Sequence, residues 1–272
     1  MSKKKVIYIL SLGHSGSTFL DYLLSLHPDF VGLGEVSNIY SGKNNTEGTK
    51  FVCSCGEGYE NCSLWSQIPD INNAADKFAY SDFYTKIITS LDEKYSGIID
   101  SSKKKNNLGE LIKMDQEGEI DLKIIFLVKD ARSWAASGKG LLKENRKKFV
   151  PMWFRVIRWL NQWYKWNKGM VNFLEKHQLS HLTISYEDMC FKTQKTMNKI
   201  FEFSGADPAL WSPENQPNTH IAHGNRTKLK SKDKTIRYDN RWFYDFYINL
   251  IYPLMPRVSR WNKELQSPKE DK

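Results

Sequence analysis

Six residues near the amino terminus have the types and spacing of a phosphate-binding turn: Gly13, His14, Ser15, Gly16, Ser17 and Thr18. The apolar, β-branched run Val6–Leu12 precedes them, and apolar residues at helical spacing follow. This pattern predicts a strand, a tight loop and the start of a helix. In such a turn, backbone N–H groups and the positive end of the helix dipole converge on an anion, and glycines let the backbone approach it.

The same loop lacks the lysine that nucleotide kinases use to reach the β- and γ-phosphates. In the kinase pattern a Lys follows the last glycine, whereas Ser17 follows Gly16 here. The residues therefore favour a 5′-phosphate-like group over a triphosphate. A strand–helix turn without any ligand is the alternative that the loop alone leaves open.

Two more polar clusters come directly after predicted strands. Asp100-Ser101-Ser102-Lys103 ends one strand, and Lys129 and Ser137 follow the buried strand Lys123–Val128. Because ligands of open α/β sheets bind outside the carboxyl ends of the strands, both clusters can meet the first loop. Lys129 and Ser137 could then reach a second phosphate. Taken singly, each residue is better explained as a solvated charge or a helix-start residue.

Composition limits the class of protein. The 272 residues and 40% hydrophobic content predict one domain over 1–265 and a charged, disordered tail over 266–272. The net charge of +9 favours an anionic ligand, an acidic substrate or an anionic surface, but no nucleic-acid recognition motif is present. We expect no membrane span, because no apolar run reaches about 18 residues. The short stretch before the first strand leaves no room for a signal peptide, which predicts a cytoplasmic protein.

Alternating strand and helix signals predict an α/β fold with a central, mainly parallel sheet flanked by helices. Strands are expected at Val6–Leu12, Ile98–Asp100, Lys123–Val128 and His181–Ser185. Helices are expected at Ser17–Ser25, Asp82–Lys94, Ala131–Leu142, Trp153–Lys176, Asp188–Ser204 and Asn240–Leu250. Polar loops are expected at Ser41–Lys50, Gly138–Pro151 and Ser212–Asn240.

Three of the four cysteines, Cys53, Cys55 and Cys62, lie close together in the sequence. Zinc would require a fourth ligand, and Cys-x-Cys departs from the usual Cys-x-x-Cys spacing. No histidine stands beside them. We therefore expect reduced thiols in a small structural turn and no metal, with a zinc site as the alternative.

In their order and spacing, these motifs resemble the sulfotransferase family that uses 3′-phosphoadenosine 5′-phosphosulfate (PAPS). The resemblance runs from about Val6 to Trp242 and is nearest to the bacterial and tyrosylprotein-type branch. It rests on residues 13–18, His27-Pro28, Gly34-Glu35, Cys55-Gly56, Cys62, Trp65, residues 100–103, 127–132, Ser137, Tyr186-Glu187-Asp188, Gly224-Asn225-Arg226, Asp239 and Trp242. It implies a three-layer, P-loop-like fold and in-line transfer of a sulfuryl group to a hydroxyl or amine acceptor.

The resemblance also implies a role for each matching position. Residues 13–18 would hold the 5′-phosphosulfate. Lys129, with Ser137, would hold the 3′-phosphate, and Arg226 would add to that contact from a closing loop. Lys103 would stabilise charge on the sulfuryl group and the bridging oxygen. Lys129 stands where the family usually has Arg, so it keeps the charge but lacks the bidentate fork.

Two residues compete for the role of general base. The resemblance assigns it to Glu35, whose pKa burial would have to raise from the ordinary value of about 4.3. His14 is the rival, and it stands where the family usually carries Arg or Lys. It cannot be a neutral base and a cationic stabiliser at the same moment. No metal is expected, because PAPS lacks a β/γ-phosphate pair.

The acceptor cannot be named from the residues and could be a small molecule, a glycan or a peptide. The expected product is adenosine 3′,5′-bisphosphate (PAP). Two alternatives remain at this point: a P-loop kinase or nucleotide-processing enzyme, and a protein that binds PAPS without catalysis.

Overall fold

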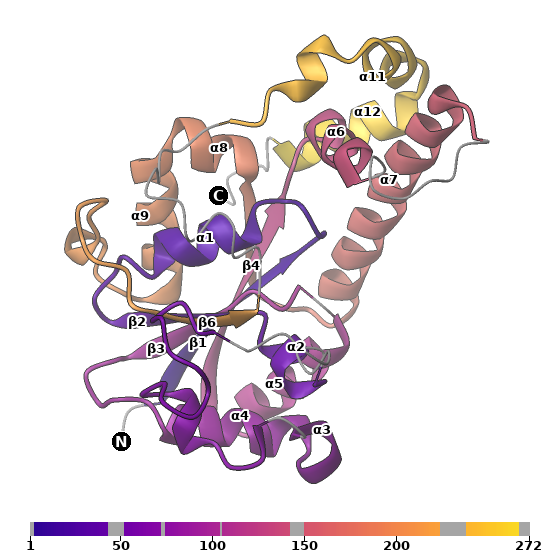
Figure 1. Ribbon diagram of the computed structural model, residues 1–272. Coiled ribbons are helices and arrows are strands. Elements are labelled where there is room, and N and C mark those ends of the chain that lie inside the picture. Colours follow the sequence, from indigo (N-terminus) through magenta and orange to yellow (C-terminus); the bar gives the residue numbers. More distant parts are fainter. Residues whose placement is uncertain are drawn as a thin grey trace. The chain divides into compact units, whose positions relative to one another are not determined.

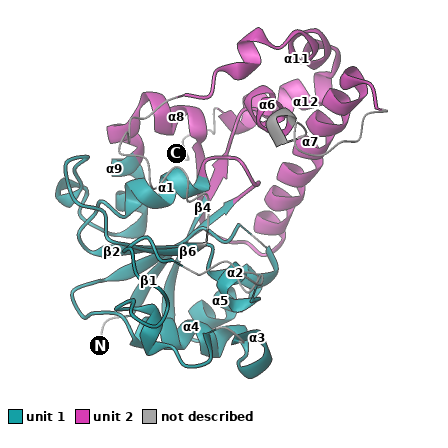
Figure 2. Ribbon diagram, in the orientation of Figure 1, with its two compact units in different colours: residues 1–10, 17–125, 197–235 teal, residues 11–16, 126–196, 236–272 magenta. Residues whose placement is uncertain are grey.

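The computed structural model describes residues 3–42, 52–71, 74–103, 105–141, 150–223 and 238–266. The chain divides into two compact units, coloured separately in Figure 2. Unit 1 comprises residues 1–10, 17–125 and 197–235, and unit 2 comprises residues 11–16, 126–196 and 236–272.

A six-stranded sheet with the order β5-β4-β1-β3-β2-β6 is the centre of the fold (Figure 1). Its strands are β1 (Lys4–Ser11), β2 (Phe30–Gly34), β3 (Gly97–Asp100), β4 (Ile120–Val128), β5 (His181–Ser185) and β6 (Thr219–His223). The pairs β1–β3, β2–β3 and β2–β6 are parallel. The predicted α/β fold with a central, mainly parallel sheet is therefore confirmed.

Helices connect the strands, as parallel pairing requires. The α-helices are α1 (Ser17–Leu24), α2 (Val36–Tyr40), α3 (Ala74–Lys77), α4 (Tyr80–Thr89), α5 (Lys105–Gln116), α6 (Ala131–Leu141), α7 (Met152–Lys176), α8 (Tyr186–Phe191), α9 (Thr193–Ser204), α11 (Phe246–Ile251) and α12 (Pro256–Gln266). The 3₁₀ turns are η1 (Trp65–Gln67), η3 (Pro208–Leu210), η4 (Arg241–Tyr244) and η5 (Tyr252–Leu254). No described helix is long and apolar enough to cross a membrane.

Unit 1 has helices on both sides of its strands. α1 and α9 lie on one side and α4 and α5 on the other (Figure 2). Residues 6–10 of β1 are fully buried, as expected for a strand covered on both faces. On the α9 side, the His27 ring lies 5.2 Å from Phe30 and 4.6 Å from Phe201, centre to centre. The core of unit 1 therefore extends over both faces of the strands.

Unit 2 is built around the long helix α7. Its buried face includes Val156, Leu160 and Trp163, at the helical spacing seen in the sequence. The Trp163 indole Nε1 donates a hydrogen bond to the Lys129 carbonyl at 2.9 Å. This contact fixes the backbone at the end of β4.

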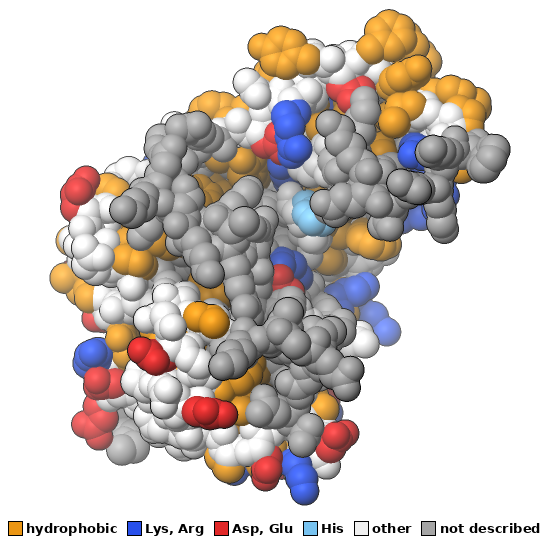
Figure 3. All heavy atoms as spheres, viewed as in Figure 1, with side chains coloured by type: hydrophobic (Ala, Val, Ile, Leu, Met, Phe, Trp, Pro, Cys, Tyr) orange, Lys and Arg blue, Asp and Glu red, His pale blue; other side chains and the backbone are white. Residues whose placement is uncertain are grey.

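Hydrophobic side chains gather on the surface of unit 2 over α11 (Figure 3). The residues in this region that are more than half exposed are Phe243, Tyr244, Phe246, Leu250 and Leu254. The predicted single helix over Asn240–Leu250 is wrong. Asp245 interrupts it and caps α11, because its side chain accepts a hydrogen bond from Ile248 N.

Two other predicted elements differ from the structure. The expected helix Asp188–Ser204 is two helices, which meet at Lys192 in a non-helical backbone conformation. The expected loop Ser212–Asn240 contains the strand β6, which pairs with the unpredicted strand β2. Two glycines among the five residues of β2 mask its strand pattern.

Candidate functional site

The predicted phosphate loop connects β1 to α1. His14 and Gly16 both have a left-handed backbone, with φ of 68° and 94°. A Cβ at Gly16 would lie only 2.7 Å from a Tyr186 ring carbon, so only glycine fits. The Gly13 carbonyl accepts a hydrogen bond from the Trp134 indole Nε1 at 2.8 Å. Contacts from α6 and α8 therefore hold the loop within unit 2.

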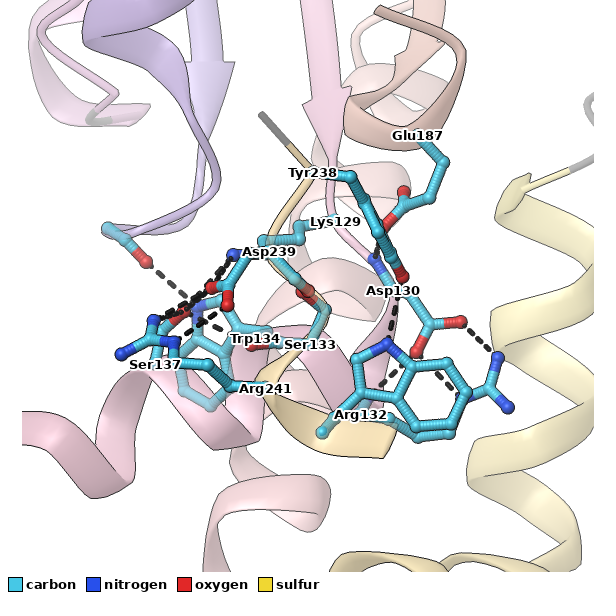
Figure 4. A network of polar contacts seen from close by, with 12 residues as sticks. Lys129, Asp130, Arg132, Ser133, Trp134, Ser137, Glu187, Tyr238, Asp239 and Arg241 are labelled. Carbon is cyan, nitrogen blue, oxygen red and sulfur yellow. Dashed lines mark hydrogen bonds and ion pairs between the residues drawn. The ribbon is translucent and has the colours of Figure 1, made fainter. Parts of the chain in front are cut away.

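Beside these contacts, donors from three side chains converge on the carboxylate of Asp239 (Figure 4). Lys129 Nζ lies 2.8 Å and Ser137 Oγ 3.0 Å from Asp239 Oδ2. Arg241 donates from Nη2 to Oδ2 at 2.8 Å and from Nε to Oδ1 at 2.7 Å. The Lys129 ammonium also lies 4.7 Å from the ring centre of Tyr186, the residue that packs against Gly16. The cluster thus places two cations and a hydroxyl group around one carboxylate, next to the loop.

The charges of this cluster depend on one another. Burial lowers the pKa of Lys129, whose side chain is 5% exposed, while Asp239 opposes that effect. Burial would raise the pKa of Asp239, but the hydrogen bond from Arg241 and the charge of Lys129 outweigh it and hold the pKa well below its ordinary value. A lysine buried to this degree requires a neighbouring anion, and Asp239 is that anion here.

A second ion pair shapes the turn between β4 and α6. Asp130 accepts hydrogen bonds from Arg132 Nε at 2.9 Å and Nη2 at 2.8 Å, and from Asn262 Nδ2 at 2.9 Å. The Arg132 guanidinium lies over the Trp242 ring, 3.8 Å from its centre. These contacts from η4 and α12 hold the residues that follow Lys129.

Glu187, on α8, contacts the backbone of the same turn. Its carboxylate oxygens accept from the Asp130 backbone N–H at 3.2 and 3.3 Å. Burial and the nearby charge of Asp130 raise the pKa of Glu187 to about 7. This carboxyl group therefore changes charge near neutral pH.

In unit 1, the structure brings two predicted catalytic residues together. Lys103 Nζ donates to Glu35 Oε1, and Asn38 Nδ2 donates to the other carboxylate oxygen. The Lys103 and Glu35 side chains are 16% and 17% exposed. Lys103 has a left-handed backbone with φ of 69°, and such strained residues concentrate at functional sites. A further hydrogen bond joins the segments that carry Glu35 and Lys103, since Ser37 N donates to Ser102 Oγ at 2.9 Å.

The predicted site residues are divided between the two units. Unit 2 contains residues 13–16 with Lys129 and Ser137, and unit 1 contains Ser17, Thr18, Glu35 and Lys103. His14 is exposed, whereas Ser15 and Ser17 are buried. Arg226 lies outside the described residues.

Sequence reasoning missed Arg241, which supplies a bidentate fork to the Lys129 cluster. It lies in η4, a segment predicted to be an ordinary helix, and 104 residues separate it from Ser137. The motif that pairs Asp239 with Trp242 flanks Arg241 in the sequence. That motif is the sequence signal that could have pointed to Arg241.

Comparison with known proteins identifies the family and the fold. The profile described as "Sulfotransferase family" matches residues 7–212. The chain is similar to the solved sulfotransferase domain from the curacin biosynthetic pathway, at 20% identity over 97% of this chain and 98% of that chain, with a TM-score of 0.61. It is also similar to the sulfotransferase domain from the Synechococcus PCC 7002 olefin synthase, at 19% identity over 94% and 96% of the two chains, with a TM-score of 0.60.

At these identities the two likenesses show a shared fold. A search of curated protein sequences finds no significant match. The family profile, however, extends from β1 to beyond η3 and covers more than half of the chain. On that match, this chain belongs to the sulfotransferase family.

Proposed function

We propose that this protein transfers a sulfuryl group from PAPS to a hydroxyl or amine acceptor and releases PAP. The observation that carries the proposal is the convergence of Lys129, Ser137 and Arg241 on one carboxylate. A carboxylate and a phosphate are both anionic acceptors for such donors. Asp239 therefore stands in for the 3′-phosphate, the group that distinguishes PAPS from other adenine nucleotides with a 5′-phosphate.

The chemistry of these side chains fits a phosphate. Lys129 supplies a buried positive charge and Ser137 a hydroxyl donor. Arg241 supplies the planar fork that suits two phosphate oxygens, which a lysine cannot provide. We propose that Asp239 releases these donors when the 3′-phosphate arrives, and that Arg226 adds a further contact.

The loop residues 13–18 are proposed to hold the 5′-phosphosulfate. Backbone N–H groups at the start of α1 would point at the anion, aided by the helix dipole. The left-handed conformations of His14 and Gly16 support this role, because such turns expose successive N–H groups on one side. The His14 side chain, when protonated, would add a positive charge.

Lys103 and Glu35 are proposed to act on the transfer itself. When bound, PAPS supplies a sulfuryl group whose bond to the 5′-phosphate oxygen breaks as the acceptor oxygen or nitrogen bonds to sulfur. Lys103 would stabilise the charge that develops on the leaving oxygen. Glu35 would take the acceptor proton. Their ion pair supports this assignment, because each side chain holds the other in place.

Titration calorimetry with PAP and AMP tests the nucleotide assignment. We expect PAP to bind at least tenfold more tightly, since one lost phosphate contact in a buried site costs about 1.4 kcal/mol or more. Lys129→Ala should remove most of this preference and leave AMP binding little changed. Lys192→Ala is the control, because Lys192 forms an exposed ion pair with Asp188 on α8. Equal affinities of the wild type for PAP and AMP would contradict the 3′-phosphate assignment.

An acceptor screen with ³⁵S-labelled PAPS tests the reaction. The screen covers glycans, tyrosine peptides, phenols and small alcohols, and we expect label transfer to at least one class. Tight PAPS binding without transfer to any acceptor would indicate a non-catalytic binding protein. Turnover of ATP in a parallel assay would instead indicate a kinase.

A further inference from the structure

The three clustered cysteines meet a histidine from a distant part of unit 1. Cys53, Cys55 and Cys62 lie in the loop before η1, and His220 lies on β6. The three sulfur atoms and one imidazole nitrogen all lie within 4.8 Å of one another. We propose that these four residues bind one Zn²⁺ ion in a structural site.

The separations match those of a tetrahedral zinc site. His220 Nδ1 lies 3.2 Å from Cys62 Sγ and 3.7 Å from Cys53 Sγ, and Cys55 Sγ lies 3.8 Å from Cys62 Sγ. Zn–S bonds of about 2.3 Å and a Zn–N bond of about 2.0–2.1 Å at tetrahedral angles place sulfur atoms about 3.8 Å apart and sulfur about 3.6 Å from nitrogen. These three separations lie within about 0.4 Å of the tetrahedral values, and all six separations lie within 4.8 Å.

The types of the four donor atoms also favour zinc over magnesium or calcium. Three thiolates and one imidazole are a known ligand combination for structural zinc, and soft sulfur ligands disfavour magnesium or calcium. All three cysteines are free thiols, and the 3.8 Å between Cys55 and Cys62 sulfurs is far beyond a disulfide bond of about 2.05 Å. Cys53 and Cys62 are buried, so two of the ligands are shielded from solvent.

The surrounding backbone is arranged to hold the cysteines in place. Ser54 N donates to Ile221 O at 3.0 Å, and Ile221 N donates to Ser54 Oγ at 2.8 Å, so the loop pairs with β6 at the residue directly after His220. Trp65 Nε1 donates to the His220 carbonyl at 2.7 Å. Gly56, with φ of 99°, makes the turn that follows Cys55.

Four protein ligands fill the tetrahedral positions and leave none for water or substrate, so the site is structural. It would fasten the loop before η1 to β6. The proposal reverses the expectation of a metal-free cysteine cluster. The fourth ligand could not be recognised from the sequence, because His220 lies 158 residues after Cys62.

Elemental analysis of the full chain, purified with a thiol reductant, tests the site. We expect one zinc per chain in the wild type. Cys55→Ser and His220→Ala should each lose most of the zinc, and Cys190→Ser should keep it, because Cys190 lies on α8 in unit 2. A chelator should lower the melting temperature of the wild type. Reduced wild-type protein that takes up no zinc on reconstitution would overturn the proposal.

Cobalt substitution of the wild type tests the geometry even if a variant fails to fold. Co²⁺ should give intense visible bands of a tetrahedral ion and a thiolate-to-cobalt charge-transfer band. X-ray absorption of the zinc form should show three sulfurs at about 2.3 Å and one nitrogen at about 2.0–2.1 Å. An octahedral cobalt spectrum, or a zinc shell of oxygen atoms, would contradict the assignment.

Discussion

Asp239 is the residue that best tests the proposed 3′-phosphate site. Its carboxylate takes up donors from Lys129, Ser137 and Arg241, and a bound phosphate would need the same donors. We predict that Asp239→Asn binds PAP several-fold to about tenfold more tightly, because a neutral amide competes less for the cations and no longer repels the phosphate. AMP affinity should change little. Calorimetry at two salt concentrations measures both, and weaker PAP binding would show that Asp239 itself positions the nucleotide.

Glu35 is tested by removing its basicity while keeping its shape. We predict that Glu35→Gln lowers kcat about 10²-fold or more, the usual contribution of a general base, and leaves PAP affinity nearly intact. Steady-state kinetics with PAPS and an acceptor from the screen measure this. Glu110→Gln is the matched control, since Glu110 forms an exposed ion pair with Lys113 in the same unit.

The rival base, His14, provides the contrasting outcome. His14→Ala should weaken both PAPS binding and turnover, because His14 lies in the phosphate loop. His14→Arg should keep activity and move the pH optimum upward, since Arg stays charged. An inactive His14→Arg together with a fully active Glu35→Gln would reverse the two assignments.

From spacing alone, residues close in sequence could be predicted to act together, and distant ones could not. Lys129 and Ser137 are eight residues apart across a strand end and two helical turns, so their contact follows from helix geometry. Arg241 and His220 reach their clusters from far along the chain. Only the fold brings them there: the motif of Asp239 and Trp242 marks the position of Arg241 but not its contact with Ser137.

At the scale of elements, the loop between β1 and α1 depends on Gly16. We predict that Gly16→Ala destabilises the protein by about 1–3 kcal/mol and abolishes PAP binding. Its φ of 94° is unfavourable for alanine, and the added methyl group would lie 2.7 Å from Tyr186. Gly109→Ala is the control, because Gly109 lies on α5 outside the site and a Cβ there meets nothing within 4 Å. Urea unfolding and calorimetry of both variants measure the difference, and equal effects would contradict a specific need for Gly16.

Elements with an unbroken apolar run were predictable, and those shaped by tertiary contacts were not. β1 and β4 are buried runs that glycine does not interrupt. β2 contains Gly32, where a Cβ would lie 2.3 Å from Asp21 Oδ1. Its composition thus reflects the packing of α1 against the strand, which the local sequence does not reveal.

For the whole molecule, three buried carboxyl groups among the described residues make the stability fall as the pH rises. Burial raises the pKa of Asp21 to about 8, of Glu187 to about 7 and of Asp100 to about 6. A raised pKa means that the folded state binds protons more tightly than the unfolded state, whose carboxyl groups titrate near 4. The stabilisation that these three groups contribute is complete below about pH 4 and is lost as the pH rises through their pKa values in the folded state. Asp130 and Asp239 have lowered pKa values, so their stabilisation is lost in acid.

The free energy of unfolding should therefore be greatest at mildly acidic pH and fall towards pH 8. Asp21 contributes most to this fall, and we predict that Asp21→Asn is more stable than the wild type at pH 8 and close to it at pH 5. Asparagine keeps the shape of the protonated carboxyl group and an oxygen for Gly34 N, which now lies 3.1 Å from Asp21 Oδ2. The difference between variant and wild type should widen by about 2 kcal/mol or more over this range, at about 1.4 kcal/mol per pKa unit. Urea unfolding at several pH values measures it. Asp82→Asn, which removes an exposed carboxylate of α4, is the control, and its free energy of unfolding should change with pH as that of the wild type does. An equal change in both variants would contradict the role of Asp21.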